Sequence, residues 1–116
     1  GKVTVGDLER AVDEGQPPIV DLQAWRDHAL PWREVWDAGH YVIMVGYDEQ
    51  NLFFMDPSTM TPGPYAYLPR VELDERWHDL AGERDVPVER MTIFVRSTAT
   101  ARAADEPLPT HATRLG

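Results

Sequence analysis

Two apolar runs joined by a short polar segment constrain the fold of this chain more than any other feature. The first run covers residues 41–47 and the second covers residues 52–55, and both are apolar at neighbouring positions rather than at alternate ones. A strand with one face in water alternates polar and apolar side chains, so each run is expected to form a strand that is covered on both faces. Residues 48–51, Asp-Glu-Gln-Asn, supply the turn between them. The pair predicts a central β-hairpin in an antiparallel sheet.

A helix is predicted over residues 4–15. Thr4 and Asp7 have the spacing of a capping box, in which the hydroxyl and the carboxylate each accept a hydrogen bond from a free backbone N–H. Gly15 follows the last helical position, where a C-terminal cap is common. The apolar face of this helix consists of Leu8, Ala11 and Val12. After two prolines, residues 19–22 have the composition of a short strand.

The second half of the chain predicts one more helix between two further strands. Residues 65–68 are expected to form a short edge strand, and residues 91–95 a third long strand. Pro69 suits the first turn of a helix and Gly82 its end. The apolar stripe of this helix would consist of Val71, Leu73, Trp77 and Leu80. The fold class is therefore α+β, an antiparallel sheet with flanking helices.

Length and composition bound the organisation of the chain. Its 116 residues suffice for one domain, placed at residues 1–97, and residues 98–116 lack periodicity and are expected to form a disordered tail. A net charge of −9 argues against nucleic acid and anionic membranes as partners, because both attract basic surfaces. No apolar run is long enough to span a membrane and no signal-peptide pattern is present, which favours the cytoplasm.

His40 and Asp56 are the candidate catalytic residues. His40 stands at the start of the first hairpin strand and Asp56 directly after the second, so the two side chains are expected to be neighbours across the hairpin. A carboxylate in that position would orient an imidazole that acts as a base. The alternatives are a histidine satisfied within the core and an aspartate that begins a turn before Pro57.

Other side chains near this pair have weaker signals. Trp32 and Trp36 stand four residues apart and, with Tyr41, are candidates for substrate contact; packing on the core is the alternative. Ser58 is expected to be a turn or cap residue rather than a nucleophile. The histidines show no paired metal-ligand spacing, His28 and His78 are expected at the surface, and no metal or cofactor is expected.

The run Gly39-His40-Tyr41-Val42-Ile43-Met44-Val45-Gly46-Tyr47-Asp48, followed by Met55-Asp56-Pro57, resembles part of the papain-like cysteine peptidases of the bacteriocin-processing, double-glycine type, peptidase family C-39. The resemblance covers residues 4–96 and is closest over residues 39–77. It implies the sheet half of a papain-like fold, with His40 as general base and Asp56 as its orienter. Family members carry a catalytic cysteine and an oxyanion-hole glutamine upstream of this region, and neither has a counterpart among these residues.

Three interpretations follow. The chain is the C-terminal half of a cysteine peptidase that acts on a peptide or protein, and it is inactive alone because it has no cysteine. Alternatively, it is a cysteine-free pseudoenzyme that binds peptides or a protein partner, or an acidic α+β domain in which His40 and Asp56 are structural. The apolar faces of the hairpin favour the first, because the missing half, a second copy or a partner chain would have to cover them.

Overall fold

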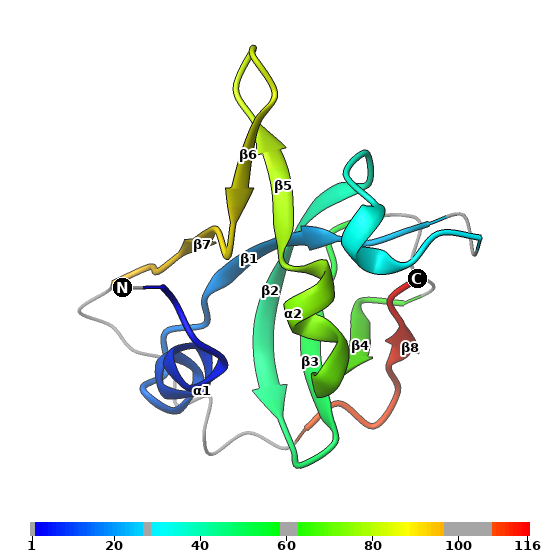
Figure 1. The fold of residues 1–116 in the computed structure, drawn as a ribbon. Coiled ribbons are helices and arrows are strands. Elements are labelled where there is room, and N and C mark those ends of the chain that lie inside the picture. The colour runs from blue at the N-terminus through cyan, green and yellow to red at the C-terminus, as the bar shows by residue number, and fades with distance from the viewer. Residues whose placement is uncertain (1, 27–28, 59–62, 97–107) are drawn as a thin grey trace.

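A computed structural model describes residues 2–26, 29–58, 63–96 and 108–116 of the chain (Figure 1). The elements in chain order are α1 (Val5–Asp13), β1 (Ile19–Gln23), the 3-10 turn η1 (Trp32–Glu34), β2 (Gly39–Tyr47), β3 (Asn51–Met55), β4 (Tyr65–Pro69), the 3-10 turn η2 (Arg70–Glu72), α2 (Leu73–Arg76), β5 (His78–Ala81), β6 (Val86–Glu89), β7 (Thr92–Ile93) and β8 (Thr113–Arg114).

Strands β7-β1-β2-β3-β4-β8 form a six-stranded sheet in that order. Neighbouring strands are antiparallel except β4 and β8, which are parallel. Strands β5 and β6 form a separate hairpin that projects from the body of the protein (Figure 1). The α+β class with a mainly antiparallel sheet is confirmed. In the part of the chain that is described, no helix is long and apolar enough to cross a membrane.

The predicted hairpin is present as β2 and β3, at the centre of the sheet. Ile43 pairs with Met55 and Tyr47 with Leu52, and the register shifts between Met44 and Gly46. This bulge makes the side chains on either side of it alternate out of phase. As a result, Met44 and Tyr47 both pack on the core side.

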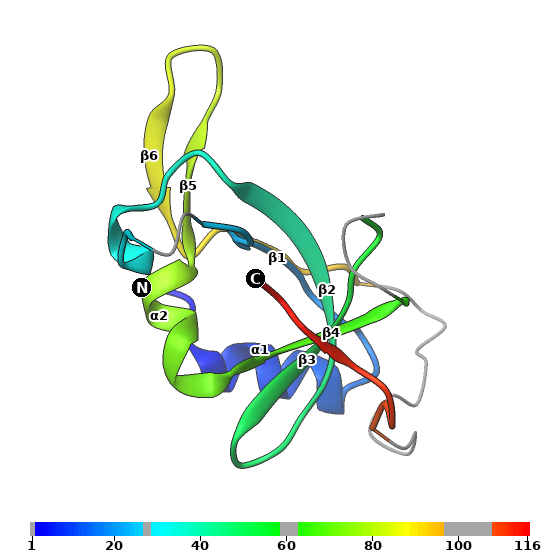
Figure 2. The ribbon, with the colours of Figure 1, turned by 90° about the vertical axis from the view of Figure 1, so that its right-hand side faces the viewer.

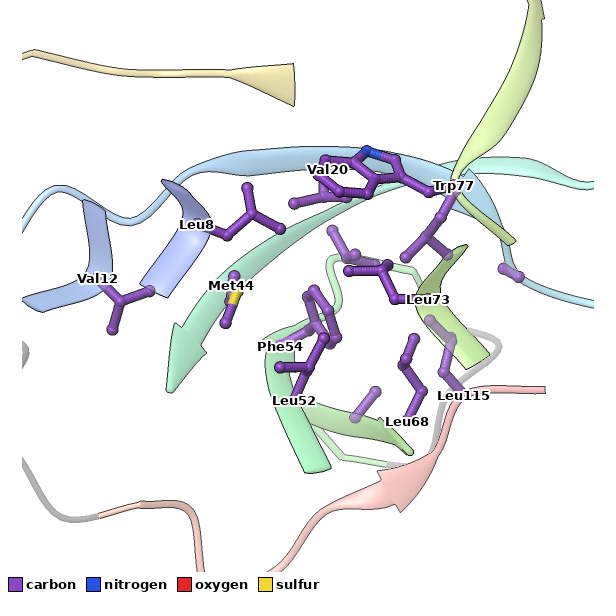
Figure 3. Packing of buried hydrophobic residues seen from close by; sticks show 14 residues of the cluster. Leu8, Val12, Val20, Met44, Leu52, Phe54, Leu68, Leu73, Trp77 and Leu115 are labelled. Atoms are coloured by element: carbon purple, nitrogen blue, oxygen red, sulfur yellow. The ribbon is translucent and has the colours of Figure 1, made fainter. Parts of the chain in front are cut away.

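The two faces of the sheet are covered differently. Both α-helices pack on one face (Figure 2), around the buried cluster of Figure 3. Its members are Leu8, Val12, Val20, Leu22, Ala24, Val42, Met44, Leu52, Phe54, Ala66, Leu68, Leu73, Trp77 and Leu115. On the opposite face Tyr41 and Met55 are exposed, and Ile43 and Phe53 are half-buried. The hairpin is therefore fully covered on one face and partly covered on the other.

Helix α1 begins as its sequence predicts. The backbone N–H of Asp7 donates to the Thr4 hydroxyl at 3.2 Å, and that of Thr4 donates to the Asp7 carboxylate at 2.8 Å. Gly15 ends the helix region with a φ of 73°, a conformation that favours glycine.

The helix predicted over residues 69–82 is wrong beyond Arg76. Helix α2 is short, and residues 78–81 form β5 instead, paired with β6. Gly82 has a φ of 76° within the turn of this hairpin rather than at a helix end. Val71 of the supposed apolar stripe is 83% exposed. Pairing with residues 86–89, which the helical pattern does not reveal, decides the outcome.

The strands predicted at residues 65–68 and 91–95 also differ from expectation. Strand β4 lies between β3 and β8, so it is not an edge strand, and the strand predicted over residues 91–95 is limited to Thr92–Ile93. The expected tail of residues 98–116 falls partly outside the described residues, but residues 113–114 form β8. The backbone N–H of Leu115 donates a hydrogen bond to the carbonyl oxygen of Tyr67 at 2.8 Å, and the Leu115 side chain is fully buried. The buried leucine explains why this segment adopts regular structure.

Leu115→Ala is expected to lower the free energy of unfolding by about 2–5 kcal/mol, because it removes a buried side chain and leaves a cavity. Chemical denaturation followed by circular dichroism measures the change. Leu108→Ala is the matched control, because Leu108 is 39% exposed and its truncation removes less buried surface. Equal, small losses in both variants would show that the segment contributes nothing to the core.

Candidate functional site

His40 and Asp56 meet at one end of the central hairpin. The distance between Nε2 of His40 and Oδ1 of Asp56 is 2.6 Å. The Asp56 side chain is fully buried and that of His40 is 16% exposed. Asp56 follows the pair Ile43–Met55 and so lies level with Val42, not His40. The imidazole therefore reaches the carboxylate diagonally, and the proximity expected from the sequence is present with a different register.

The hydrogen bonds at Asp56 indicate which tautomer a neutral imidazole adopts beside an ionised carboxylate. The backbone N–H of Ser58 donates to Oδ1 of Asp56 at 2.8 Å, as in an Asx turn. An ionised carboxylate can only accept hydrogen bonds, so Nε2 of the imidazole donates to Oδ1 of Asp56. In the neutral ring the lone pair is then at Nδ1, which is the nitrogen available to act as a base. Ser58 takes part in this turn through its backbone, as its position before a loop predicts.

Trp25, which is not one of the three candidate substrate contacts, lies beside His40. Its ring centroid lies 4.9 Å from that of His40. Trp25 follows β1, and Leu22 of β1 pairs with His40, which brings the indole beside the imidazole. An indole against the ring limits its rotation and excludes water from one side. The pairing of β1 with β2 would have been needed to find it.

The structure places the three predicted substrate contacts in different surroundings. Trp32 is buried, with the guanidinium of Arg76 3.8 Å from its ring centroid, so little of it is left for a substrate to touch. Trp36 contacts the ring of His78 in a tilted arrangement and lines a hollow of about 330 Å³ whose lining residues do not include His40. Tyr41 is exposed on the sheet face away from the core. Contact with substrate stays a prediction for Trp32, Trp36 and Tyr41.

His78 is buried, contrary to the expectation of a surface position, and its Nε2 lies 2.6 Å from the carbonyl oxygen of Val35. The pairing of β5 with β6 turns this side chain inward, whereas a helix would have turned it to solvent. His28 lies outside the described residues. Among those that are described, no group of three or more His, Asp or Glu side chains could hold a metal ion.

A buried polar cluster lies behind the site, on the sheet face opposite the imidazole. Gln23 is fully buried, and Asp21 is 2% exposed. The pKa of Asp21 is raised to about 7, first by burial and then by a hydrogen bond to Asp79 and the charge of Asp79, while a hydrogen bond from Tyr41 acts in the opposite direction. The negative charge of Asp21 in turn raises the pKa of Tyr41. Asp21 and Gln23 lie on one face of β1, and β5 packs against this strand.

A model of the Peptidase_C39 like family matches residues 2–84, a segment that includes His40, Asp56 and the buried cluster behind them. The search of curated proteins and the search of solved structures gave no significant match. The matched segment covers well over half of the chain. The chain therefore belongs to the Peptidase_C39 like family.

Proposed function

We propose that this chain supplies the base-bearing half of a Cys-His-Asp hydrolase that cleaves peptide bonds in the manner of the bacteriocin-processing peptidases. The observation that carries the proposal is the 2.6 Å hydrogen bond between His40 and the buried carboxylate of Asp56. A third group that orients a histidine is the mark of a base in nucleophilic catalysis. Membership of a peptidase-like family supports the same assignment.

The imidazole would act twice in each cycle. Nδ1 of His40 takes the proton of a cysteine thiol, and the resulting thiolate attacks the carbonyl carbon of the substrate. The imidazolium then gives this proton to the leaving amine as the C–N bond breaks, leaving a thioester. Water, deprotonated by the same nitrogen, hydrolyses the thioester and releases the thiol. Asp56 holds the ring throughout and stabilises its charged form.

The nucleophile is the part that this chain does not contain, because it has no cysteine. We place the thiolate on residues outside these 116 or on another chain, and we expect the 116-residue chain to be inactive as a peptidase by itself. The half-covered face that carries Tyr41 and Met55 supports a missing half, a second copy or a partner chain against the sheet.

A second candidate function is binding without hydrolysis. In that case the chain is a cysteine-free pseudo-peptidase that recognises a peptide or protein. The exposure of Tyr41 (48%) and Met55 (39%) on one sheet face favours it, because large apolar side chains in water are typical of interaction surfaces.

The test is covalent labelling of the protein encoded by the complete gene. A thiol-reactive peptidyl electrophile is added, and intact mass followed by peptide mapping locates the label. His40→Ala is expected to slow labelling by about 10²–10⁴-fold, because the base that generates the thiolate is lost. His111→Ala, at an exposed histidine, is the matched control and should label at the parent rate.

A label on cysteine that depends on His40 would support the hydrolase. Absence of a label, or a label whose rate is the same in His40→Ala and the parent, would overturn it. Saturable binding of the peptide without labelling would then support the binding module.

A further inference from the structure

The start of β2 is held from the face opposite the imidazole. The side-chain oxygen of Gln23 accepts a hydrogen bond from the backbone N–H of Ala38 at 2.8 Å. Its side-chain nitrogen donates to the carbonyl oxygen of His78 at 3.0 Å and to Oδ1 of Asp79 at 3.4 Å. One fully buried amide thus connects β1, the residue that leads into β2, and β5.

The carboxylate of Asp79 contacts Gly39, the residue that follows Ala38. Its Oδ1 accepts from the backbone N–H of Leu80 at 2.8 Å, which fixes the carboxylate. The carboxylate lies directly on Gly39, where any added Cβ would overlap it. The φ of Gly39 is not positive, so glycine is needed here for space and not for conformation. Gly39 immediately precedes His40 and pairs with Gln23 in the sheet.

We propose that Gln23 and Asp79 are positioning residues, which fix the backbone at Ala38 and Gly39 and thereby hold the imidazole of His40 against Asp56. Neither side chain touches the imidazole, which lies on the other face of the strand, so they act through the backbone. A short hydrogen bond tolerates little displacement, and β2 begins only one residue before His40. The functional part of this inference rests on the proposed role of His40 as a base. The positioning of the imidazole against Asp56 does not depend on that role.

The test is proton NMR of the 116-residue chain with ¹⁵N-labelled histidine. The imidazole N–H that is bonded to Asp56 should give a downfield resonance, and Asp56→Asn defines the spectrum in which that carboxylate contact is lost. Gln23→Met keeps the side-chain volume and removes both kinds of hydrogen bond. Asp79→Ala removes the carboxylate from Gly39. Both variants are expected to lose the downfield resonance while circular dichroism shows a folded chain.

Further variants separate positioning from loss of stability. Asp79→Asn retains an oxygen for the Leu80 N–H and should keep the resonance, which makes it the conservative rescue. Val12→Ala opens a cavity in the core under α1, away from β2's start, and should lower stability while leaving the resonance in place. Gly39→Ala should lose the resonance, and the double variant with Asp79→Ala should be no worse than Asp79→Ala alone.

Retention of the parent resonance in both Gln23→Met and Asp79→Ala would overturn the inference. Asp79 is half-buried, so its variant keeps the test decisive if Gln23→Met does not fold. The readout needs no cysteine and no substrate. If the labelling experiment fails, the NMR test of Gln23 and Asp79 as positioning residues is unaffected. If the resonance is unchanged in these variants, the labelling test of the proposed hydrolase is unaffected.

Discussion

Arg76→Met is expected to lower the free energy of unfolding by about 3–5 kcal/mol, because truncating one partner of a buried charged network leaves the other groups unpaired. The Arg76 side chain is fully buried. It donates to the backbone carbonyl oxygens of Gln23, Ala24 and Leu115 at 3.0, 3.2 and 2.8 Å. Methionine preserves much of the volume but satisfies none of these acceptors.

The charge of Arg76 persists at neutral pH. Burial lowers its pKa to about 10, and the negative charge of Glu72, 3.3 Å from Nη1, opposes this shift. The guanidinium also covers the ring of Trp32. Since its acceptors are Gln23 at the end of β1, Ala24 directly after β1 and Leu115 directly after β8, the loss should loosen the contact between these two segments.

Urea denaturation measures the effect. Arg33→Met is the matched control, because Arg33 is 68% exposed and its 3.8 Å pair with Glu75 is a surface salt bridge, which contributes about 0–1 kcal/mol. Arg76→Lys should recover part of the loss, since an ammonium cannot reach all the acceptors of the planar guanidinium. A loss below about 1 kcal/mol in Arg76→Met would contradict the assignment.

Asp21→Asn is expected to stabilise the protein at pH 8 by up to about 4 kcal/mol and to have little effect near pH 4. The pKa of Asp21 is raised to about 7 in the folded state, first by burial and then by Asp79. An unfolded chain releases this proton near pH 4. Asparagine removes the charge and can donate to the Asp79 carboxylate in its place.

The sign follows from the proton count. Between about pH 4 and pH 7 the folded state holds one proton more than the unfolded state at Asp21, so its contribution to stability falls as the pH rises. Above about pH 7 both states are ionised and the contribution is constant. The groups that face Asp21 are Tyr41 on β2 and Asp79 on β5.

The measurement is the difference in unfolding free energy between variant and parent from pH 4 to pH 8. Asp48→Asn is the control of opposite sign, because hydrogen bonds from the N–H groups of Asn51 and Gln50 lower the pKa of Asp48. Its contribution is present above the unfolded pKa and lost as the pH falls, so Asp48→Asn should do most harm at neutral pH. A flat difference for Asp21→Asn across this range would contradict the prediction.

Local signals predicted the parts of the fold that local chemistry determines. The capping box of Thr4 and Asp7 requires only residues three apart, and helix α1 begins there. The hairpin of β2 and β3 follows from two apolar runs and a four-residue turn segment. Because the two strands are adjacent in the chain, the meeting of His40 and Asp56 could also be predicted, although the bulge that sets their register could not.

Contacts between segments far apart in the sequence determined the parts of the fold that could not be predicted. Residues 78–81 have a helical pattern, but pairing with β6 makes them a strand and buries His78. Asp21 and Gln23 lie on one face of β1, and β5 packs against this strand.

The class of fold, the central hairpin and the candidate pair His40–Asp56 could be predicted from the sequence, since these depend on periodicity and on neighbours along the chain. Tertiary structure decided which groups surround that pair. Trp25 packs beside the imidazole, the guanidinium of Arg76 lies over the ring of Trp32, and the Leu115 side chain is buried in the core. Each of these contacts joins residues far apart in sequence, where burial and hydrogen-bond satisfaction outweigh local preference.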